Sequence, residues 1–306
     1  MRKYFYCLFV VFTCGFSLAG FGQQWFKYSP TAGFDINTLA VMKNGHIAIG
    51  GGKESLDSIQ IMFLTKDYGA TWNENAHDGL ASWNKSIAFA DSANGVGVGY
   101  QGRIIRTNDG GANWGNAVFP IQRNLNKVTH ITAQTYFAVG GIDSINKIHT
   151  ILKTIDGGVN WSIKRDTIGS CLRSILFTSP TKGIAVGDSG LILISTNSGN
   201  SWTYVASPIQ RDFNSITFIN SSTGFIVGGS GALGSKTILK TIDGGLSWVV
   251  LTDVAGGVLN DVAFADSTTG YIVGDSSTIL KTDNGGQTWV AQQIDQNLTG
   301  SESFRS

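Results

Sequence analysis

Short apolar runs separated by turn residues recur along most of the chain. The phrase "DVAFADSTTGYIVGDSSTILKT" holds three such runs, and "SIAFADSANGVGVGYQGRIIRT", "SILFTSPTKGIAVGDSGLILIST" and "SITFINSSTGFIVGG" repeat their order. β-Branched residues dominate and no 3.6-residue period is present, so the pattern predicts strands rather than helices. The second run, such as "YIVG" at Tyr271–Gly274, is apolar on both faces, which indicates a strand covered on both sides.

A second phrase follows these runs six times and always ends in tryptophan. The copies are "TKDYGATW", "TNDGGANW", "TIDGGVNW", "STNSGNSW", "TIDGGLSW" and "TDNGGQTW", and successive tryptophans are 42, 47, 41, 46 and 41 residues apart. A unit of this length with four short apolar runs is typical of one blade of a β-propeller. We therefore predict an all-β protein, a β-propeller of four-stranded antiparallel blades with six complete blades and almost no helix.

The aspartate of the repeated phrase is best explained as a turn former. A short acidic side chain in the hairpin between the third and fourth strands can accept backbone N–H bonds, and glycine supplies the positive φ of the turn. The tryptophan can fold back over the turn. Asparagine replaces the aspartate in two copies, which suits a capping role and not a catalytic carboxylate. The residues with this structural role are Asp67, Trp72, Asp109, Trp114, Asp156, Trp161, Asn197, Trp202, Asp243, Trp248, Asn284 and Trp289.

These phrases resemble the Asp-box, or bacterial neuraminidase repeat, with its pattern Ser/Thr-x-Asp-x-Gly-x-Thr/Ser-Trp. The longer phrase "GYIVGDSSTILKTDNGGQTW" is similar to the propellers of the photosystem II assembly and stability factor family. The resemblance covers essentially residues 23–306 and implies the propeller fold. Members in plants and cyanobacteria act as scaffolds on a reaction-centre subunit through an arginine patch, while related repeats occur in many secreted bacterial proteins. No arginine cluster of this chain matches that patch position by position.

The N-terminal segment has the features of a secretory signal peptide. "MRK" is followed by an apolar run from Cys7 to Ala19 and by small residues, so residues 1–22 are expected to be removed before Gln23. The run is too short to span a membrane comfortably. The expected location is therefore secreted, periplasmic or extracellular, and the protein is not expected to span a membrane. Only Cys171 of the three cysteines would remain, so no disulfide framework is expected.

The two ends of the chain suggest part of a seventh blade. "QQWFKYSP" around Trp25 resembles the fourth strand "SWTYVASP" around Trp202, and "GSESFRS" echoes "GSCLRS" before an inner strand. We therefore expect the propeller domain at 23–306 to carry part of a seventh blade and to be truncated at its C-terminus. Six-fold closure through the strand after Trp289 is the alternative.

Composition and loop sequences favour binding over catalysis. The formal net charge is +1, which argues against a nucleic-acid partner, and no cofactor motif or metal-ligand spacing is present. Loops joining fourth to first strands and second to third strands share one face, and variable loops on a rigid frame often carry recognition. The candidate partner-binding residues there are Arg123, Arg165 and Arg211. The expected function is a secreted, non-enzymatic scaffold that binds or assembles a protein or a surface glycan.

A glycoside hydrolase of the sialidase or xyloglucanase type is the alternative, because such enzymes also carry Asp-box propellers. Their chemistry needs two facing carboxyl groups, or a tyrosine nucleophile in sialidases. Asp57, Asp143, Asp188 and Asp275 lie in loops between second and third strands and would be the candidate acids. The arginine-containing phrase that sialidases carry near their start is missing from this sequence.

Overall fold

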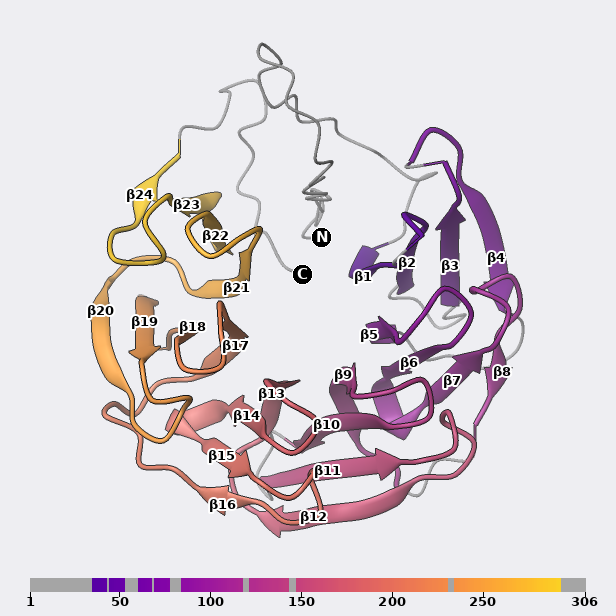
Figure 1. The fold of residues 1–306 in the computed structure, drawn as a ribbon, viewed down its shortest axis with the longest axis horizontal. Coiled ribbons are helices and arrows are strands. Elements are labelled where there is room, and N and C mark those ends of the chain that lie inside the picture. Colours follow the sequence, from indigo (N-terminus) through magenta and orange to yellow (C-terminus); the bar gives the residue numbers. More distant parts are fainter. Residues whose placement is uncertain are drawn as a thin grey trace.

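The computed structural model describes residues 35–42, 44–52, 60–67, 69–77, 84–117, 121–142, 147–230 and 234–292, and these form six four-stranded antiparallel sheets arranged as the blades of a propeller (Figure 1). Blades one to six follow chain order. Their strands are β1 (Asp35–Val41), β2 (Ile47–Gly52), β3 (Gln60–Thr65), β4 (Asn73–His77); β5 (Asn84–Phe89), β6 (Gly95–Gly99), β7 (Ile104–Thr107), β8 (Gly115–Asn116); β9 (Asn124–His130), β10 (Tyr136–Ile142), β11 (Ile148–Thr154), β12 (Ser162–Ile168); β13 (Leu172–Phe177), β14 (Gly183–Gly187), β15 (Ile192–Ser195), β16 (Thr203–Tyr204); β17 (Phe213–Phe218), β18 (Gly224–Gly228), β19 (Ser235–Thr241), β20 (Val249–Ala255); β21 (Leu259–Phe264), β22 (Gly270–Gly274), β23 (Thr278–Thr282) and β24 (Val290–Ala291).

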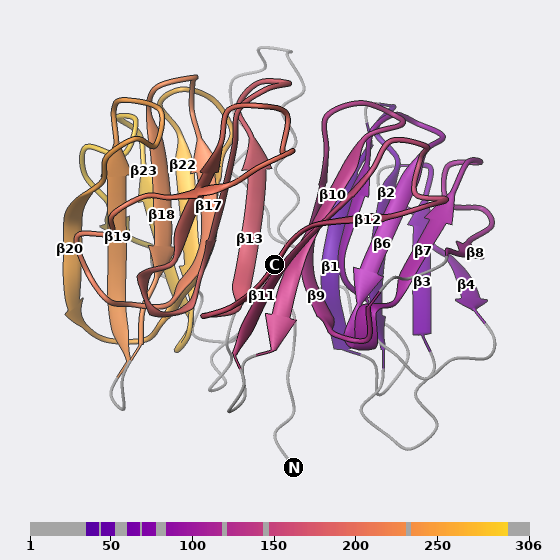
Figure 2. The same ribbon diagram turned by 90° about the horizontal axis from the view of Figure 1, so that it is seen from below.

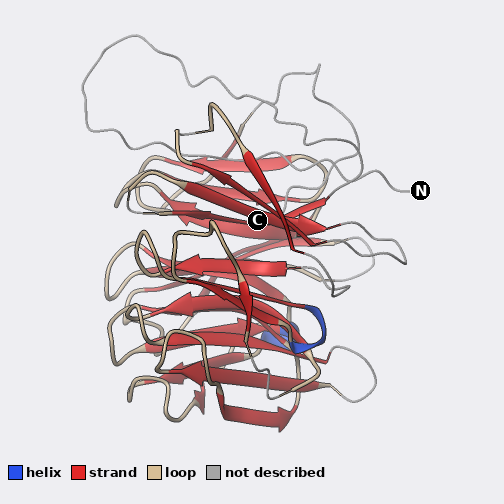
Figure 3. Ribbon diagram, turned by 90° about the vertical axis from the view of Figure 1, so that its right-hand side faces the viewer, coloured by secondary structure: helices blue, strands red, loops and turns tan. Residues whose placement is uncertain are grey.

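The six predicted four-stranded blades are confirmed. Apart from strands, the described residues form only two single-turn 3₁₀ helices, η1 (Tyr100–Gly102) and η2 (Asp188–Gly190) (Figure 3). In this described part of the chain, no helix is long and apolar enough to cross a membrane. The segment around Trp25 and residues 293–306 lie outside the described residues, so the partial seventh blade stays a prediction.

Each blade is built from the axis outward. The first strand of each blade lies nearest the axis and the fourth lies at the rim, and within a blade consecutive strands pair antiparallel (Figure 1). The inner strands β1, β5, β9, β13, β17 and β21 are successive neighbours around the axis. Figure 2 shows the strands running between the two faces of the disc, so the turns of all blades lie on one face or the other.

The core lies between the blades, where second and third strands of neighbours face each other. Ile184 and Ile194 of blade four pack in one buried cluster with Phe213, Ile226 and Leu239 of blade five. All residues of β14 and of β18 are buried. This double coverage is why the second apolar run of each repeat shows no polar alternation.

Glycine at the end of second strands permits a close approach of the inner strand. A Cβ at Gly187 would lie 2.0 Å from the carbonyl oxygen of Cys171, and one at Gly228 would lie equally close to the carbonyl of Asp212. The pairing register shifts by one residue at this point in blade four, between Leu172 and Ser174. Such a bulge leaves one extra residue on the inner strand and redirects its side chain.

Candidate functional site

Loops from fourth to first strands and from second to third strands meet on one face of the propeller, which we call the arginine face. The contacts between them cross from blade to blade. The backbone N–H of Gln101, in η1 of blade two, donates to Asn124 Oδ1 at the start of blade three, at 3.1 Å. The N–H of Ser189, in η2 of blade four, donates to Asp212 Oδ1 before blade five, at 2.9 Å. The hairpins between third and fourth strands lie on the opposite face.

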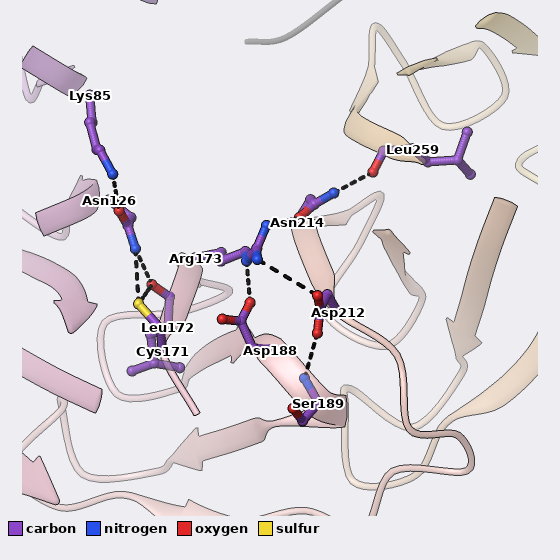
Figure 4. A network of polar contacts seen from close by, with 10 residues as sticks. All are labelled: Lys85, Asn126, Cys171, Leu172, Arg173, Asp188, Ser189, Asp212, Asn214 and Leu259. Carbon is purple, nitrogen blue, oxygen red and sulfur yellow. Dashed lines mark hydrogen bonds and ion pairs between the residues drawn. The ribbon is translucent and has the colours of Figure 1, made fainter. Parts of the chain in front are cut away.

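A belt of polar side chains runs around the axis near the arginine face. In every blade the extra residue of the inner-strand bulge is polar; these residues are Asn37, Lys85, Asn126, Arg173, Asn214 and Asn260. Lys85 Nζ donates to Asn126 Oδ1 at 2.9 Å, and Asn126 Nδ2 donates to the carbonyl of Leu172 at 2.7 Å (Figure 4). The bulges of blades two and three thus direct a side chain to the following blade.

Arg173 of this belt contacts three polar residues in blades four and five. Its Nε donates to Asp188 in a short ion pair, its Nη1 donates to Asn214 Oδ1 at 2.9 Å, and its Nη2 lies 3.7 Å from Asp212 Oδ2 (Figure 4). Asn214 Nδ2 in turn donates to the carbonyl of Leu259 at 2.8 Å. Burial raises the pKa of Asp188, and the charge of Arg173 acts in the opposite direction. The belt therefore links blades two to six.

Arg123 and Arg211 occupy the same position in blades three and five. Each precedes an inner strand and pairs with an aspartate on the outer strand of the same blade. Arg211 Nε and Nη2 donate to the two oxygens of Asp253 at 3.2 and 3.0 Å. Arg123 Nη1 makes a short ion pair with Asp166. A threonine of the third strand completes each pair, because Thr237 donates to Asp253 at 2.7 Å and Thr150 to Asp166 at 2.9 Å.

These contacts shift the pKa values of the two aspartates. Hydrogen bonds from Arg211 lower the pKa of Asp253, against a smaller opposing effect of burial. Burial alone would raise the pKa of Asp166, but hydrogen bonds from Arg123 and Thr150 outweigh it and hold the pKa below its ordinary value. Both carboxylates are therefore charged at neutral pH and hold their arginines in one orientation.

Arg165 does not join the other arginines. It lies on β12, where its Nε donates to Nε2 of the buried His149 at 2.7 Å and its Nη1 donates to the carbonyl of Trp202 at 3.1 Å. Its guanidinium also lies over the ring of Tyr204, 4.7 Å from the centroid. Of the three arginines singled out in the sequence, this one connects the outer parts of blades three and four.

Sequence reasoning missed Arg173, although the repeat contains the signal. In the inner strands of blades two to six a polar residue stands directly after a buried residue, as Asn214 does after Phe213. Aligning the six repeats would show this column. With Arg173 included, two half-exposed arginines lie on neighbouring blades: Arg173 and Arg211 have side-chain exposures of 39% and 36%, and Asp212, which contacts Arg173, directly follows Arg211.

The candidate acids lie in unlike surroundings. The side chain of Asp188 is buried and paired with Arg173, while Asp275 accepts a hydrogen bond from Asn260 Nδ2 at 3.0 Å. Asp57 and Asp143 lie outside the described residues. Among the residues that the structure does describe, no group of three or more histidine, cysteine, aspartate or glutamate side chains could hold a metal ion.

The opposite face carries the six repeated turns, which we call the Asp/Asn turns. In blade three, Asp156 Oδ1 accepts the backbone N–H of Asn160 at 2.9 Å and the hydroxyl of Thr154 at 2.7 Å, and Oδ2 accepts from Asn160 Nδ2 at 2.8 Å. In blade four, Asn197 Oδ1 accepts the N–H of Ser201 at 2.9 Å, but Asn197 Nδ2 donates to the Ser201 hydroxyl. The acceptor common to both is Oδ1, so either residue closes the turn.

The tryptophan that ends each turn covers the blade core. Trp248 is 5% exposed and meets Phe218 edge-on, with ring centroids 6.1 Å apart; Trp202 meets Phe177 in the same way at 6.0 Å. Trp202 Nε1 also donates to the carbonyl of Gly199 at 3.2 Å, within its own turn. These contacts are local to one blade, and the six turns are spread around the rim rather than gathered at one point.

Comparison with known proteins supports the resemblance seen in the repeats. The family model described as Photosynthesis system II assembly factor YCF48 matches residues 252–306. The fold is similar to a solved structure titled "YCF48 bound to D1 peptide", at 17% identity and a TM-score of 0.67, over 90% of this chain and 87% of that one. YCF48 from Cyanidioschyzon merolae is similar at 18% identity and a TM-score of 0.66, over 90% and 88%. The chain is therefore similar to YCF48 in its fold and, over residues 252–306, in its sequence.

A glycosidase shares the architecture as well. The GH74 xyloglucanase from Xanthomonas campestris is similar at 12% identity and a TM-score of 0.64, over 81% of this chain but only 45% of that one. No curated protein matches the sequence. At these identities the solved structures establish the fold alone, so function must be argued from the residues.

Proposed function

We propose that the protein is an exported, non-enzymatic scaffold whose arginine face binds a segment of another protein. The observation that carries this proposal is the pair of half-exposed guanidinium groups of Arg173 and Arg211, which aspartates hold in place on neighbouring blades. Arg211 Nη1 donates to no described residue. A guanidinium held in one orientation loses little further entropy on binding, and its planar donors suit carboxylate groups.

The YCF48 structure solved with a D1 peptide gives the proposal its class of partner, a polypeptide. The arginine face favours a polypeptide partner whose bound segment offers a carboxylate, either from an acidic side chain or from a chain terminus. Export rests on the basic and apolar N-terminal segment. Fractionation of cells expressing the full chain should find the protein outside the cytoplasm, beginning at Gln23, and an uncleaved cytoplasmic protein would contradict this part.

The binding proposal can be tested with one substitution and a matched control. Arg211→Gln removes a guanidinium from the arginine face, and Arg106→Gln removes one from β7, whose end lies near the Asp/Asn turns. Each protein is immobilised and exposed to exported and membrane-associated proteins from cells of its own source. The proposal expects a specific partner that binds wild type and Arg106→Gln but not Arg211→Gln. Equal capture by all three, with equal melting temperatures, would refute it.

Glycoside hydrolysis is the second candidate because a GH74 enzyme shares the propeller architecture. The proposal expects no turnover of xyloglucan, aryl glycosides or sialosides above background. Turnover that Asp188→Asn or Asp275→Asn abolishes would favour the hydrolase, since a glycosidase needs carboxyl groups on both sides of the scissile bond.

A further inference from the structure

The outer strand of blade five is longer than the outer strands of blades two, four and six, and it is largely apolar. β8, β16 and β24 contain two residues each, whereas β20 contains seven and reads "VVLTDVA". Its sheet ends there, since β19 is the neighbour of β20 on one side and no other described strand follows it. An outer strand of this length presents backbone N–H and C=O groups that an added strand can use.

Exposed apolar side chains follow β20 and the turn that leads into it. They are Ile242, Leu246, Val249, Val250, Leu251 and Val254, which we call the apolar rim. The exposed fraction is 75% for Ile242 and 62% for Leu246. Natural edge strands are usually protected by charged side chains, and large exposed apolar patches usually mark interaction sites.

Blade three contains a matched strand that is protected. β12 has the same length as β20, the same bulge and the same aspartate, because Asp166 and Asp253 both pair with a threonine of the third strand. The register places Lys164 where β20 has Leu251, and Arg165 where β20 has Thr252. β20 therefore has the exposed Leu251 where β12 has Lys164, although β12 also exposes Ile163 and Ile168.

Two lysines lie beside the apolar rim, and Lys240 Nζ also lies 5.5 Å from the ring centroid of Phe225. Lys240 lies opposite Val249 and Lys236 lies opposite Val254, so one lysine stands near each end of β20. Neither forms a salt bridge with a described residue. The two carboxylates of this region already have partners, because Asp253 is paired with Arg211 and Asp243 accepts hydrogen bonds from Thr241 and Ser247 within its turn. A second copy of this chain would bring the same two lysines and two carboxylates that already have partners, so charge complementarity favours a different occupant.

We infer that β20 binds an extended segment of another protein, which adds a fifth strand to blade five. The segment fits if apolar residues alternate along it and a carboxylate lies near each end, within reach of Lys236 and Lys240. Strand addition obtains affinity from backbone hydrogen bonds and specificity from alternate side chains. This surface is separate from the arginine face, so the inference does not rest on the proposed function.

The test uses a dye-labelled synthetic peptide of alternating valine and threonine with glutamate at both ends, and a counterpart with lysine at both ends. Fluorescence anisotropy should show the glutamate peptide binding about tenfold more tightly, because Lys236 and Lys240 attract glutamate and repel lysine. Leu251→Lys places a lysine where β12 has Lys164, and it should also weaken binding by about tenfold. Ile168→Lys, at the exposed end of β12, should leave it unchanged.

Two further measurements locate the site. Hydrogen exchange of the amides in β20 should slow when the glutamate peptide is added, and Leu251→Lys should melt near the wild-type temperature. Failure of the glutamate peptide to bind, equal binding of both peptides, or equal binding by Leu251→Lys would overturn the inference. So would sedimentation showing a wild-type dimer that Leu251→Lys dissolves. Leu251→Lys should still capture the partner of the arginine face, so that each proposal can fail alone.

Discussion

Replacing His149 by glutamine should remove much of the loss of stability that we expect between pH 7.5 and 5. The ring is fully buried, and its Nε2 accepts a hydrogen bond from Arg165 Nε. An arginine can only donate, so the proton of the neutral ring must be on Nδ1. Protonating Nε2 would break this bond and place two cations in contact. Burial, followed by the charge of Arg165, lowers the pKa of His149 from 6.5 to about 4.

The direction and size of the effect follow from this shift. An unfolded chain binds a proton at His149 below pH 6.5, whereas the folded protein does so only near pH 4, so folding becomes less favourable as the pH falls through this window. Each unit of pKa difference is worth about 1.4 kcal/mol, and at pH 5 roughly one and a half units of the window have been crossed. The expected loss is therefore about 2 kcal/mol of unfolding free energy for this group.

Urea unfolding of wild type, His149→Gln and His46→Gln at pH 7.5 and 5 measures this difference. Wild type and the control His46→Gln, which replaces a partly exposed histidine, should lose more unfolding free energy than His149→Gln, by about 2 kcal/mol. A glutamine can still accept the bond from Arg165, so His149→Gln should remain folded. Equal losses in all three proteins would refute the reasoning.

Three further predictions concern stability. Trp248→Ala should cost about 3–5 kcal/mol, because it empties a buried aromatic site, while Leu246→Ala, an exposed residue two positions earlier, should change thermal stability by less than about 0.5 kcal/mol. Asp243→Asn should be tolerated far better than Asp243→Ala in thermal melting, since Oδ1 would still accept the N–H of Ser247; equal damage would contradict the turn role. Asn214→Ala should cost about 1–3 kcal/mol in urea unfolding, because the carbonyl of Leu259 and Arg173 Nη1 lose their partner; an unchanged midpoint would show that the belt adds no stability.

The blades could be predicted from sequence because their information is local and repeated. Each apolar run, each turn and each tryptophan lies within one unit of 41–47 residues, and six copies confirm the register. Even the double burial of second strands is visible, because their runs lack polar alternation. The side-chain hydrogen bonds of the aspartate and asparagine residues in the Asp/Asn turns reach at most four residues along the chain, as from Asp243 to Ser247.

The arginine face could not be predicted in the same way because its contacts are distant in sequence. Arg123 meets Asp166 across 43 residues, and this pairing depends on the length and bulge of β12. Arg173 is directed toward the next blade by a bulge that only the pairing register reveals. Arg165 follows Lys164 on an outer strand, and nothing in the neighbouring sequence indicated that it contacts the buried His149. The difference between Lys164 in β12 and Leu251 in β20 also becomes visible only when the pairing register aligns the two strands.

Hydrogen exchange of the protein with and without its captured partner tests the central claim most directly. If the arginine face binds a protein segment, amides in η2 and in the loop before β17 should exchange more slowly in the complex, because Ser189 and Arg211 lie there. Amides of the Asp/Asn turns on the opposite face should be unaffected. Slowing confined to those turns, or no slowing on the arginine face in a saturated complex, would contradict the account.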